Sequence, residues 1–161
     1  HVSLETRLWW RGGWQFHWHH VVAHRPAVLR LGTYSLPLPD GLTRVLEVSE
    51  RFGRAANAER GVAIQPLAGF ASVRAHESPP DRRAHLYTWH SLVLTAETER
   101  LGGAHDLVAL VWAGLDEKES SPWQVVLSRP GRVVLRHERH GTWQIECPGL
   151  PAFDKNAILR L

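Results

Sequence analysis

The chain has 161 residues and a mass of 18.2 kDa, which is the size of one globular domain. Hydrophobic residues make up 43% and charged residues 22%, which excludes a collagen-like or wholly disordered chain, and the longest apolar stretch, Leu107–Ala113, is far shorter than the roughly 20 residues that a membrane helix needs. The net charge of +3 comes from scattered arginines rather than from a basic block, so neither nucleic acid nor a membrane is an expected partner.

The first third of the chain predicts a β-hairpin and one further strand. Side chains alternate over Ser3–Trp10 and again over Trp14–Ala23, and Arg11-Gly12-Gly13 between them is a turn. In the first strand one face carries Leu4, Thr6, Leu8 and Trp10, and the other carries Glu5, Arg7 and Trp9. In the second strand one face carries Trp14, Phe16, Trp18, His20 and Val22, and the other carries Gln15, His17, His19 and Val21. A third strand over Ala27–Tyr34 ends at the proline- and glycine-containing segment Leu36–Gly41.

The rest of the chain predicts more strands and a single helix. The strands are expected at Thr43–Ser49, Gly61–Pro66, Ala71–His76, Leu86–Thr95, Asp106–Ala113, Trp123–Ser128, Arg132–Glu138 and Thr142–Glu146. Ser49 would cap a helix over Glu50–Arg60, and two polar loops, Glu77–Arg83 and Leu115–Ser121, are candidates for a rim that meets a partner. About ten short strands without alternating helices predict an all-β fold, a single antiparallel β-sandwich domain over residues 1–161.

A histidine-rich strand is the densest cluster of chemically active side chains. In a strand, His17 and His19 point the same way at a spacing of about 7 Å, which suits two zinc ligands, or an acid and a stacking partner for a sugar ring. The simpler interpretation is a solvated strand face, because zinc needs further ligands, for which His24, His85 and His90 are the candidates. His137–His140 has the wrong spacing for a zinc-protease motif, and no other catalytic motif is present. We therefore expect no catalytic residue, no metal and no cofactor.

Eight tryptophans are the second unusual feature, because the flat indole ring can stack on a pyranose. Strand alternation predicts that five of them fill the core: Trp10, Trp14, Trp18, Trp112 and Trp143. Trp9 and Trp123 are expected to be exposed, and Arg7 and Arg11 beside Trp9 suit the carboxylate of an acidic sugar. The candidate substrate-binding residues are Arg7, Trp9, Arg11, His17, His19 and Trp123.

Several segments resemble a known bacterial family. They are residues 6–21 (TRLWWRGGWQFHWHHV), 29–36 (LRLGTYSL), 89–94 (WHSLVL) and 107–113 (LVALVWA). Together they resemble the C-terminal β-sandwich of the domain-of-unknown-function 2264 family, which is related to heparinase II/III-type lyases. In those proteins a helical toroid precedes the sandwich and carries most of the catalytic groups. The resemblance implies that this chain is the C-terminal part of a larger protein, consistent with the absence of methionine.

The expected function is therefore that of an accessory, largely non-catalytic sandwich of a bacterial carbohydrate-active enzyme. It would pack on the N-terminal helical toroid domain of the same parent chain, which would act on a glucuronic-acid-type glycan as a hydrolase or a lyase. One alternative is an autonomous carbohydrate-binding module for an acidic oligosaccharide, which exposed tryptophans beside arginines would favour, whereas buried tryptophans favour the accessory role. Another is a small enzyme with a histidine-based metal site. The single cysteine favours a reducing compartment, here the bacterial cytoplasm.

Overall fold

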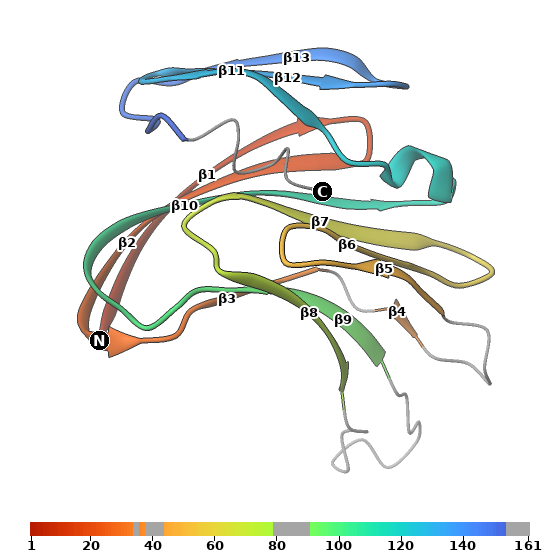
Figure 1. Cartoon of the computed structure of the whole chain (residues 1–161), viewed down its shortest axis with the longest axis horizontal. Helices are drawn as coiled ribbons and strands as arrows, with labels where there is room; N and C mark the ends of the chain where they lie inside the picture. The colour runs from red at the N-terminus through yellow and green to blue at the C-terminus, as the bar shows by residue number, and fades with distance from the viewer. Residues whose placement is uncertain (34–35, 38–43, 79–90, 154–161) are drawn as a thin grey trace.

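Antiparallel strands dominate the part of the chain that the structure describes, which is residues 1–33, 36–37, 44–78 and 91–153. Within these residues, the computed structural model arranges thirteen strands and one short 3-10 helix into three stacked sheets (Figure 1). The prediction of an all-β antiparallel sandwich is confirmed. Across the described ranges, no helix has both the length and the apolar character that crossing a membrane requires.

The central layer, sheet A, has six strands in the order β1-β2-β10-β7-β6-β5. Their bounds are β1 Val2–Arg11, β2 Trp14–Ala27, β10 Leu101–Gly114, β7 Gly61–Ala68, β6 Gly53–Ala56 and β5 Arg44–Val48. β1 and β2 form the predicted hairpin, in which Arg11 pairs with Trp14 across a two-residue turn. Gly12 in this turn has a φ of 58°, a left-handed conformation that glycine adopts without strain. β1 is thus one edge strand of sheet A.

Two smaller sheets cover the two faces of sheet A (Figure 1). Sheet C has the order β11-β12-β13, with bounds Gln124–Arg129, Arg132–His137 and Gly141–Glu146. Sheet B is built around β9, Ser91–Glu97, which pairs with β8, Ser72–Ser78, and with two short strands, β3 Arg30–Gly32 and β4 Leu36–Pro37. The 3-10 helix η1, Glu117–Ser120, lies between β10 and β11.

The two spaces between the layers are filled differently. Tryptophans pack between sheets A and C, with ring centroids 6.3 Å apart for Trp14 and Trp123 and 5.6 Å apart for Trp123 and Trp143. The space between sheets A and B is aliphatic, and its buried side chains are Leu36, Ala55, Val62, Ile64, Val73, Leu92, Leu94, Ala96 and Val111. Because β7 is covered on both faces, it is almost continuously buried instead of alternating.

The predicted helix over Glu50–Arg60 is wrong. Part of this segment forms strand β6 of sheet A. The hydroxyl of Ser49 accepts a hydrogen bond from the backbone N–H of Phe52 at 3.1 Å, which closes a tight turn in place of a helix cap. A side chain at Gly53 would place its Cβ 2.8 Å from Cγ1 of Val73, so the glycine permits close packing of sheets A and B. Pairing and burial between distant segments thus outweigh the local helix propensity.

The other predicted strands are found close to their expected positions, with one exception. Only Arg30–Gly32 of the predicted strand Ala27–Tyr34 pairs in sheet B, and Leu36–Pro37, expected to end a strand, pairs with β9. The predicted loop Leu115–Ser121 contains η1. Residues 34–35, 38–43 and 79–90 lie outside the described residues. Parts of the predicted segments Leu36–Gly41, Glu77–Arg83 and Leu86–Thr95 therefore lie outside them too.

Candidate functional site

The β1–β2 hairpin presents a mixed aromatic, aliphatic and imidazole surface on the side of sheet A that faces sheet B. Directly opposite residues of two paired strands share a face, so the hairpin register defines this surface. We call it the histidine face, and its residues are Leu4, Thr6, Leu8, Trp10, Gln15, His17, His19 and Val21. No acidic residue, lysine or arginine is among them.

The two histidines of this face are neutral at pH 7. Burial, and secondarily the nearby ring of His19, lower the pKa of His17 to about 4. Burial also lowers the pKa of His19, and the two ring centroids are 5.5 Å apart. His17 Nε2 donates a hydrogen bond to Oε1 of Gln15 at 3.0 Å, and His19 Nδ1 is 2.8 Å from the hydroxyl oxygen of Thr6. These bonds orient both rings on the sheet.

The second nitrogen of each ring is buried without a hydrogen-bond partner. Among the described residues, neither His17 Nδ1 nor His19 Nε2 bonds to a protein group. Buried ring nitrogens without partners are uncommon in folded proteins. Both nitrogens lie below the surface of the histidine face, where solvent does not reach them.

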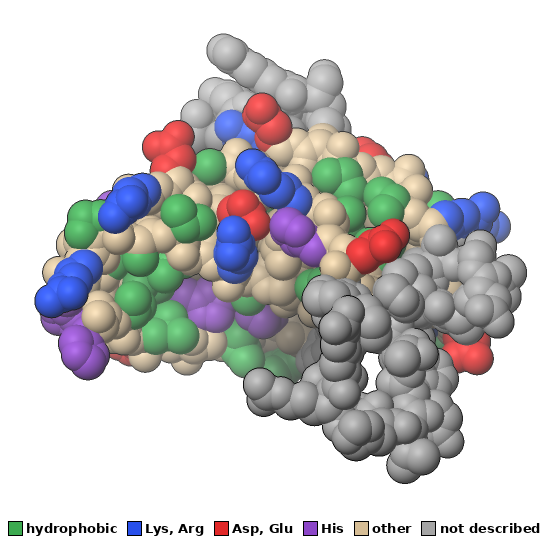
Figure 2. Space-filling view, turned by 90° about the horizontal axis from the view of Figure 1, so that it is seen from below, with side chains coloured by type: hydrophobic (Ala, Val, Ile, Leu, Met, Phe, Trp, Pro, Cys, Tyr) green, Lys and Arg blue, Asp and Glu red, His purple; other side chains and the backbone are tan. Residues whose placement is uncertain are grey.

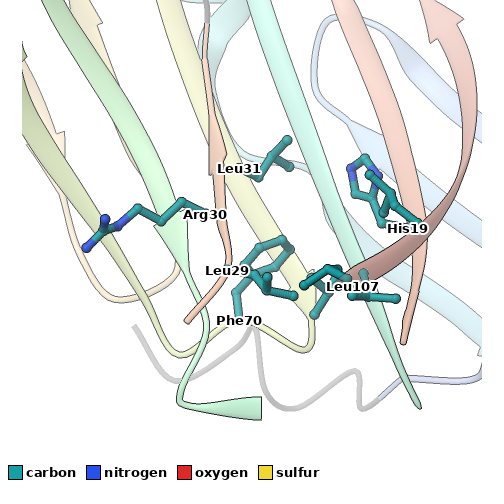
Figure 3. Close-up of a pocket in the computed structure, with 9 residues that line it drawn as sticks. His19, Leu29, Arg30, Leu31, Phe70 and Leu107 are labelled. Atoms are coloured by element: carbon teal, nitrogen blue, oxygen red, sulfur yellow. The ribbon is translucent and has the colours of Figure 1, made fainter. Parts of the chain in front are cut away.

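A cavity of about 190 Å³ lies where the histidine face meets sheet B. Apart from His19 and Arg30, its lining is apolar, and consists of Val2, Leu4, Val21, Leu29, Leu31, Phe70 and Leu107. The side chain of Arg30 points away from the other lining residues (Figure 3). Because small-molecule sites usually enclose roughly 300 Å³ or more, this cavity does not form a complete ligand site from the described residues.

The edge strand β1 leaves large apolar side chains uncovered beside the cavity. Trp10 is 63% exposed and Leu4 is 62% exposed, and Val2 and Leu8 on the same face are also exposed. Figure 2 views the molecule from this side, and shows histidine and hydrophobic side chains next to one another where the surface recedes. An exposed apolar stripe rimmed by polar groups is typical of a surface that meets a ligand or another protein domain.

The six residues predicted to bind substrate do not form one site. His17 and His19 lie together on the histidine face. The intervening positions of β1 point to the opposite side of sheet A, toward sheet C, and they include Arg7, Trp9 and Arg11. Trp123 lies in the core between these two sheets.

The predicted exposure of Trp9 and Trp123 is wrong. Trp123 is only 1% exposed, and its ring stacks on His140 with an interplanar angle of 11° and centroids 6.0 Å apart. Trp9 is half-buried against the same core, edge-on to Phe16 at 5.6 Å. Both rings are held by the layer between sheets A and C, which leaves neither free to stack on a sugar in the manner predicted.

The two arginines are exposed, but they contact their own chain. Arg7 places its guanidinium carbon 5.0 Å from the centre of the Trp18 ring and donates to Sγ of Cys147 at 3.1 Å. Arg11 donates to the backbone oxygen of His140 at 3.0 Å. These contacts connect the β1–β2 hairpin to the chain around sheet C, which is a structural role.

Trp10 is a functional candidate that the sequence does not identify, because strand alternation predicts a core position for it. Alternation assigns it to the correct face, but the edge position of β1 leaves that face uncovered. The two-residue turn pairs Leu8 with His17 and Thr6 with His19, so Trp10 shares a face with both histidines. This register was the available signal.

The histidines do not assemble a metal centre in the described part of the chain. Its residues contain no group of three or more His, Cys, Asp or Glu side chains that could hold a metal ion. Of the further ligands considered, His24 hydrogen-bonds the hydroxyl of Ser3 at 3.2 Å, and His85 and His90 lie outside the described residues.

His137 has a structural role in a different part of the molecule. Its buried ring donates from Nε2 to the backbone oxygen of Ser121 at 2.9 Å, and Nδ1 accepts from the backbone N–H groups of Arg139 and His140 at 3.1 and 3.2 Å. Both ring nitrogens are thus satisfied in the neutral form, and burial lowers the pKa. The ring fastens the β12–β13 turn to the loop before β11.

Comparisons with known proteins address the fold. No protein-family model matches the sequence, and no curated protein matches it either. A mutant of the heparan sulfate lyase HepC from Pedobacter heparinus is similar in structure, with a TM-score of 0.54 at 9% identity over 84% of this chain. The unmutated lyase gives a TM-score of 0.47 at 12% identity. In both comparisons this chain spans only 22% of the lyase chain. The chain therefore shares its fold with part of a heparinase-type enzyme, whereas membership of the domain-of-unknown-function 2264 family is not shown.

Proposed function

We propose that this chain is the accessory, largely non-catalytic sandwich of a larger carbohydrate-active enzyme, and that its histidine face forms one wall of the glycan cleft. The observation that carries the proposal is that this face is built as half of a site. It has an exposed indole and oriented polar groups, yet the adjoining cavity has a volume of only about 190 Å³. The opposite wall would come from a helical toroid domain of the same parent chain.

The chemistry of the histidine face suits the uncharged parts of a sugar. Trp10 offers a flat apolar surface for a pyranose ring, and Gln15 opposite it and Thr6 further along β1 provide neutral polar groups. His17 and His19 are neutral at pH 7, so they add no charge to this surface. The carboxylates or sulfates of an acidic glycan would therefore be bound by other residues.

The burial of most tryptophans favours the accessory role over an autonomous binding module. Among the described residues, Trp9 is half-buried, and the buried tryptophans are Trp14, Trp18, Trp112, Trp123 and Trp143. Of the tryptophans in the described residues, Trp10 is the only exposed one. One exposed ring at the margin of an apolar stripe resembles an interdomain surface more than a stacking platform with several rings.

The size and activity of the native protein test the first part of this proposal. Because the chain spans 22% of the similar lyase, an antibody against it should detect a native polypeptide several times larger than 18.2 kDa. We expect that polypeptide to degrade a uronic-acid-containing glycan as a lyase or a hydrolase. A native protein of about 18 kDa, or one without such activity, would contradict the proposal.

Kinetics of the native polypeptide test the role of the histidine face. We expect Trp10→Ala to raise KM about tenfold with a much smaller effect on kcat, since it removes binding without touching the reacting atoms. His24→Gln, on an exposed residue at the end of β2, is the matched control and should leave KM unchanged.

If the 161-residue chain alone binds the glycan as tightly as the native polypeptide does, it is an autonomous binding module and the accessory role is refuted.

A further inference from the structure

Sheet B carries a second cluster of polar side chains on the side away from the cavity. It consists of Arg30 on β3, Arg74 and His76 on β8, and Glu97 on β9, and we call it the Glu97 cluster. Figure 2 shows cationic, acidic and histidine side chains gathered near the middle of this surface. Three strands of the sheet thus contribute to one group of charges.

Glu97 holds the cluster together. Its side chain is only 10% exposed, and its Oε1 accepts a hydrogen bond from Nε of Arg30 at 2.7 Å. Oε2 lies 3.6 Å from Nε of Arg74, and Nε2 of His76 lies 3.4 Å from Oε1. The hydrogen bond from Arg30, followed by the charges of Arg30 and Arg74, lowers the pKa of Glu97. The carboxylate is therefore ionised at neutral pH.

One carboxylate does not balance two guanidinium groups. Arginine stays protonated in proteins, so the cluster has a charge of at least +1. Within the described residues, Glu97 is the only acidic partner of Arg30 and of Arg74. Two like charges held close together are unfavourable, and a bound anion would relieve this repulsion.

The geometry leaves suitable donors for such an anion. Glu97 engages both arginines through Nε, the nitrogen nearest the chain, so this contact leaves the terminal Nη groups of each guanidinium for a ligand. Both side chains are 64% exposed. A guanidinium fixed in this way matches the planar or tetrahedral oxygens of a carboxylate or a sulfate.

We propose that the Glu97 cluster binds the anionic substituents, carboxylate or sulfate, of an acidic glycan. This rests on the proposed function, because the histidine face has no cation with which to bind these groups. β3 connects the two surfaces, since Leu29 and Leu31 line the cavity while Arg30 between them points away from it (Figure 3). A glycan that crosses β3 from the cavity would reach the cluster.

Calorimetric titration of the 161-residue chain tests the proposal. The probes are a sulfated uronic-acid oligosaccharide, an unsulfated uronic-acid oligosaccharide, a neutral oligosaccharide of the same length, and single-stranded DNA of matched charge. We expect binding of at least one acidic oligosaccharide, and the difference between the two shows whether sulfate or carboxylate is recognised. Arg74→Gln should weaken that binding about tenfold, the scale of one lost charge-assisted interaction.

The matched control is Arg136→Gln, on an exposed arginine of sheet C, which should change the affinity less than twofold. The melting temperature of each variant shows that it is folded. Failure of wild type to bind either acidic oligosaccharide, or an equal loss in both variants, refutes the proposal. Binding of DNA with the same affinity and the same dependence on Arg74 also refutes it, because the cluster would then be a general polyanion site. A loss of affinity in Arg74→Gln without a loss in Trp10→Ala supports the Glu97 cluster and not the histidine face. The reverse result supports the histidine face and refutes the Glu97 cluster, so the two proposals fail independently.

Discussion

Acid should weaken the fold through His17. A histidine whose pKa is lower in the folded chain than in the unfolded chain stabilises the fold fully above the unfolded pKa, and this contribution is lost as the pH falls toward the folded pKa. For His17 the pH range runs from 6.5 down to about 4. The difference corresponds to about 3 kcal/mol, which we reduce to about 1–2 kcal/mol because the ring is partly exposed. His19 and His137 act in the same direction, so wild type loses more than this one contribution.

Urea denaturation at pH 7.5 and pH 4.5 measures the effect. In His17→Gln the amide keeps hydrogen-bonding capacity but does not titrate, so its loss of unfolding free energy between the two pH values should be about 1–2 kcal/mol smaller than that of wild type. His24→Gln, on an exposed residue, should follow wild type. Equal losses in wild type and His17→Gln, or a His17 pKa near 6.5 by NMR, would show that His17 does not make the fold sensitive to acid.

Three further predictions concern packing and hydrogen bonding. Gly61→Ala places a Cβ 2.9 Å from Cζ3 of the buried Trp112, so it should lower the free energy of unfolding by about 1–3 kcal/mol. The control Gly102→Ala, whose Cβ would lie 3.6 Å from Pro26, should lower it far less. Similar melting temperatures for the two variants would contradict this prediction. Trp10→Ser should lower the free energy of unfolding by less than about 1 kcal/mol, whereas Trp14→Ala, at a buried residue, should lower it by about 3–5 kcal/mol. Comparable losses, measured by circular dichroism, would show that Trp10 is a core residue. His137→Ala removes partners from three backbone groups, so it should cost about 2–4 kcal/mol and speed amide exchange at Arg139 and His140; unchanged exchange would rule out the fastening role.

The period-2 pattern of the sequence was enough to predict the all-β class and most strands. The β1–β2 hairpin is the best case, because its alternation and its Gly12-Gly13 turn are local features that also fix the register. The helix predicted over Glu50–Arg60 fails for the opposite reason. Ala55 and Ala56 lie in β6 of the central sheet, and nothing in the local sequence reports the contact of this strand with sheet B.

The candidate site was only half predictable from the sequence. Alternation placed His17 and His19 on one face, and the register of the two-residue turn adds Trp10 to that face. What alternation cannot tell is which face of an edge strand another sheet will cover. Sheet C covers the side of Trp9, while sheet B stops short of Trp10, so the expected exposure of these two neighbours is reversed.

Contact between the histidine face and a glycan can be measured by an NMR titration of the isotope-labelled 161-residue chain with a uronic-acid oligosaccharide. Millimolar oligosaccharide allows weak binding by half a site to be detected. We expect clear shift changes at the Trp10 indole N–H, the His17 and His19 rings and the Thr6 amide. No change at these positions, or changes centred on Arg7, Trp9 and Arg11 on the opposite side of the sheet, would contradict this expectation.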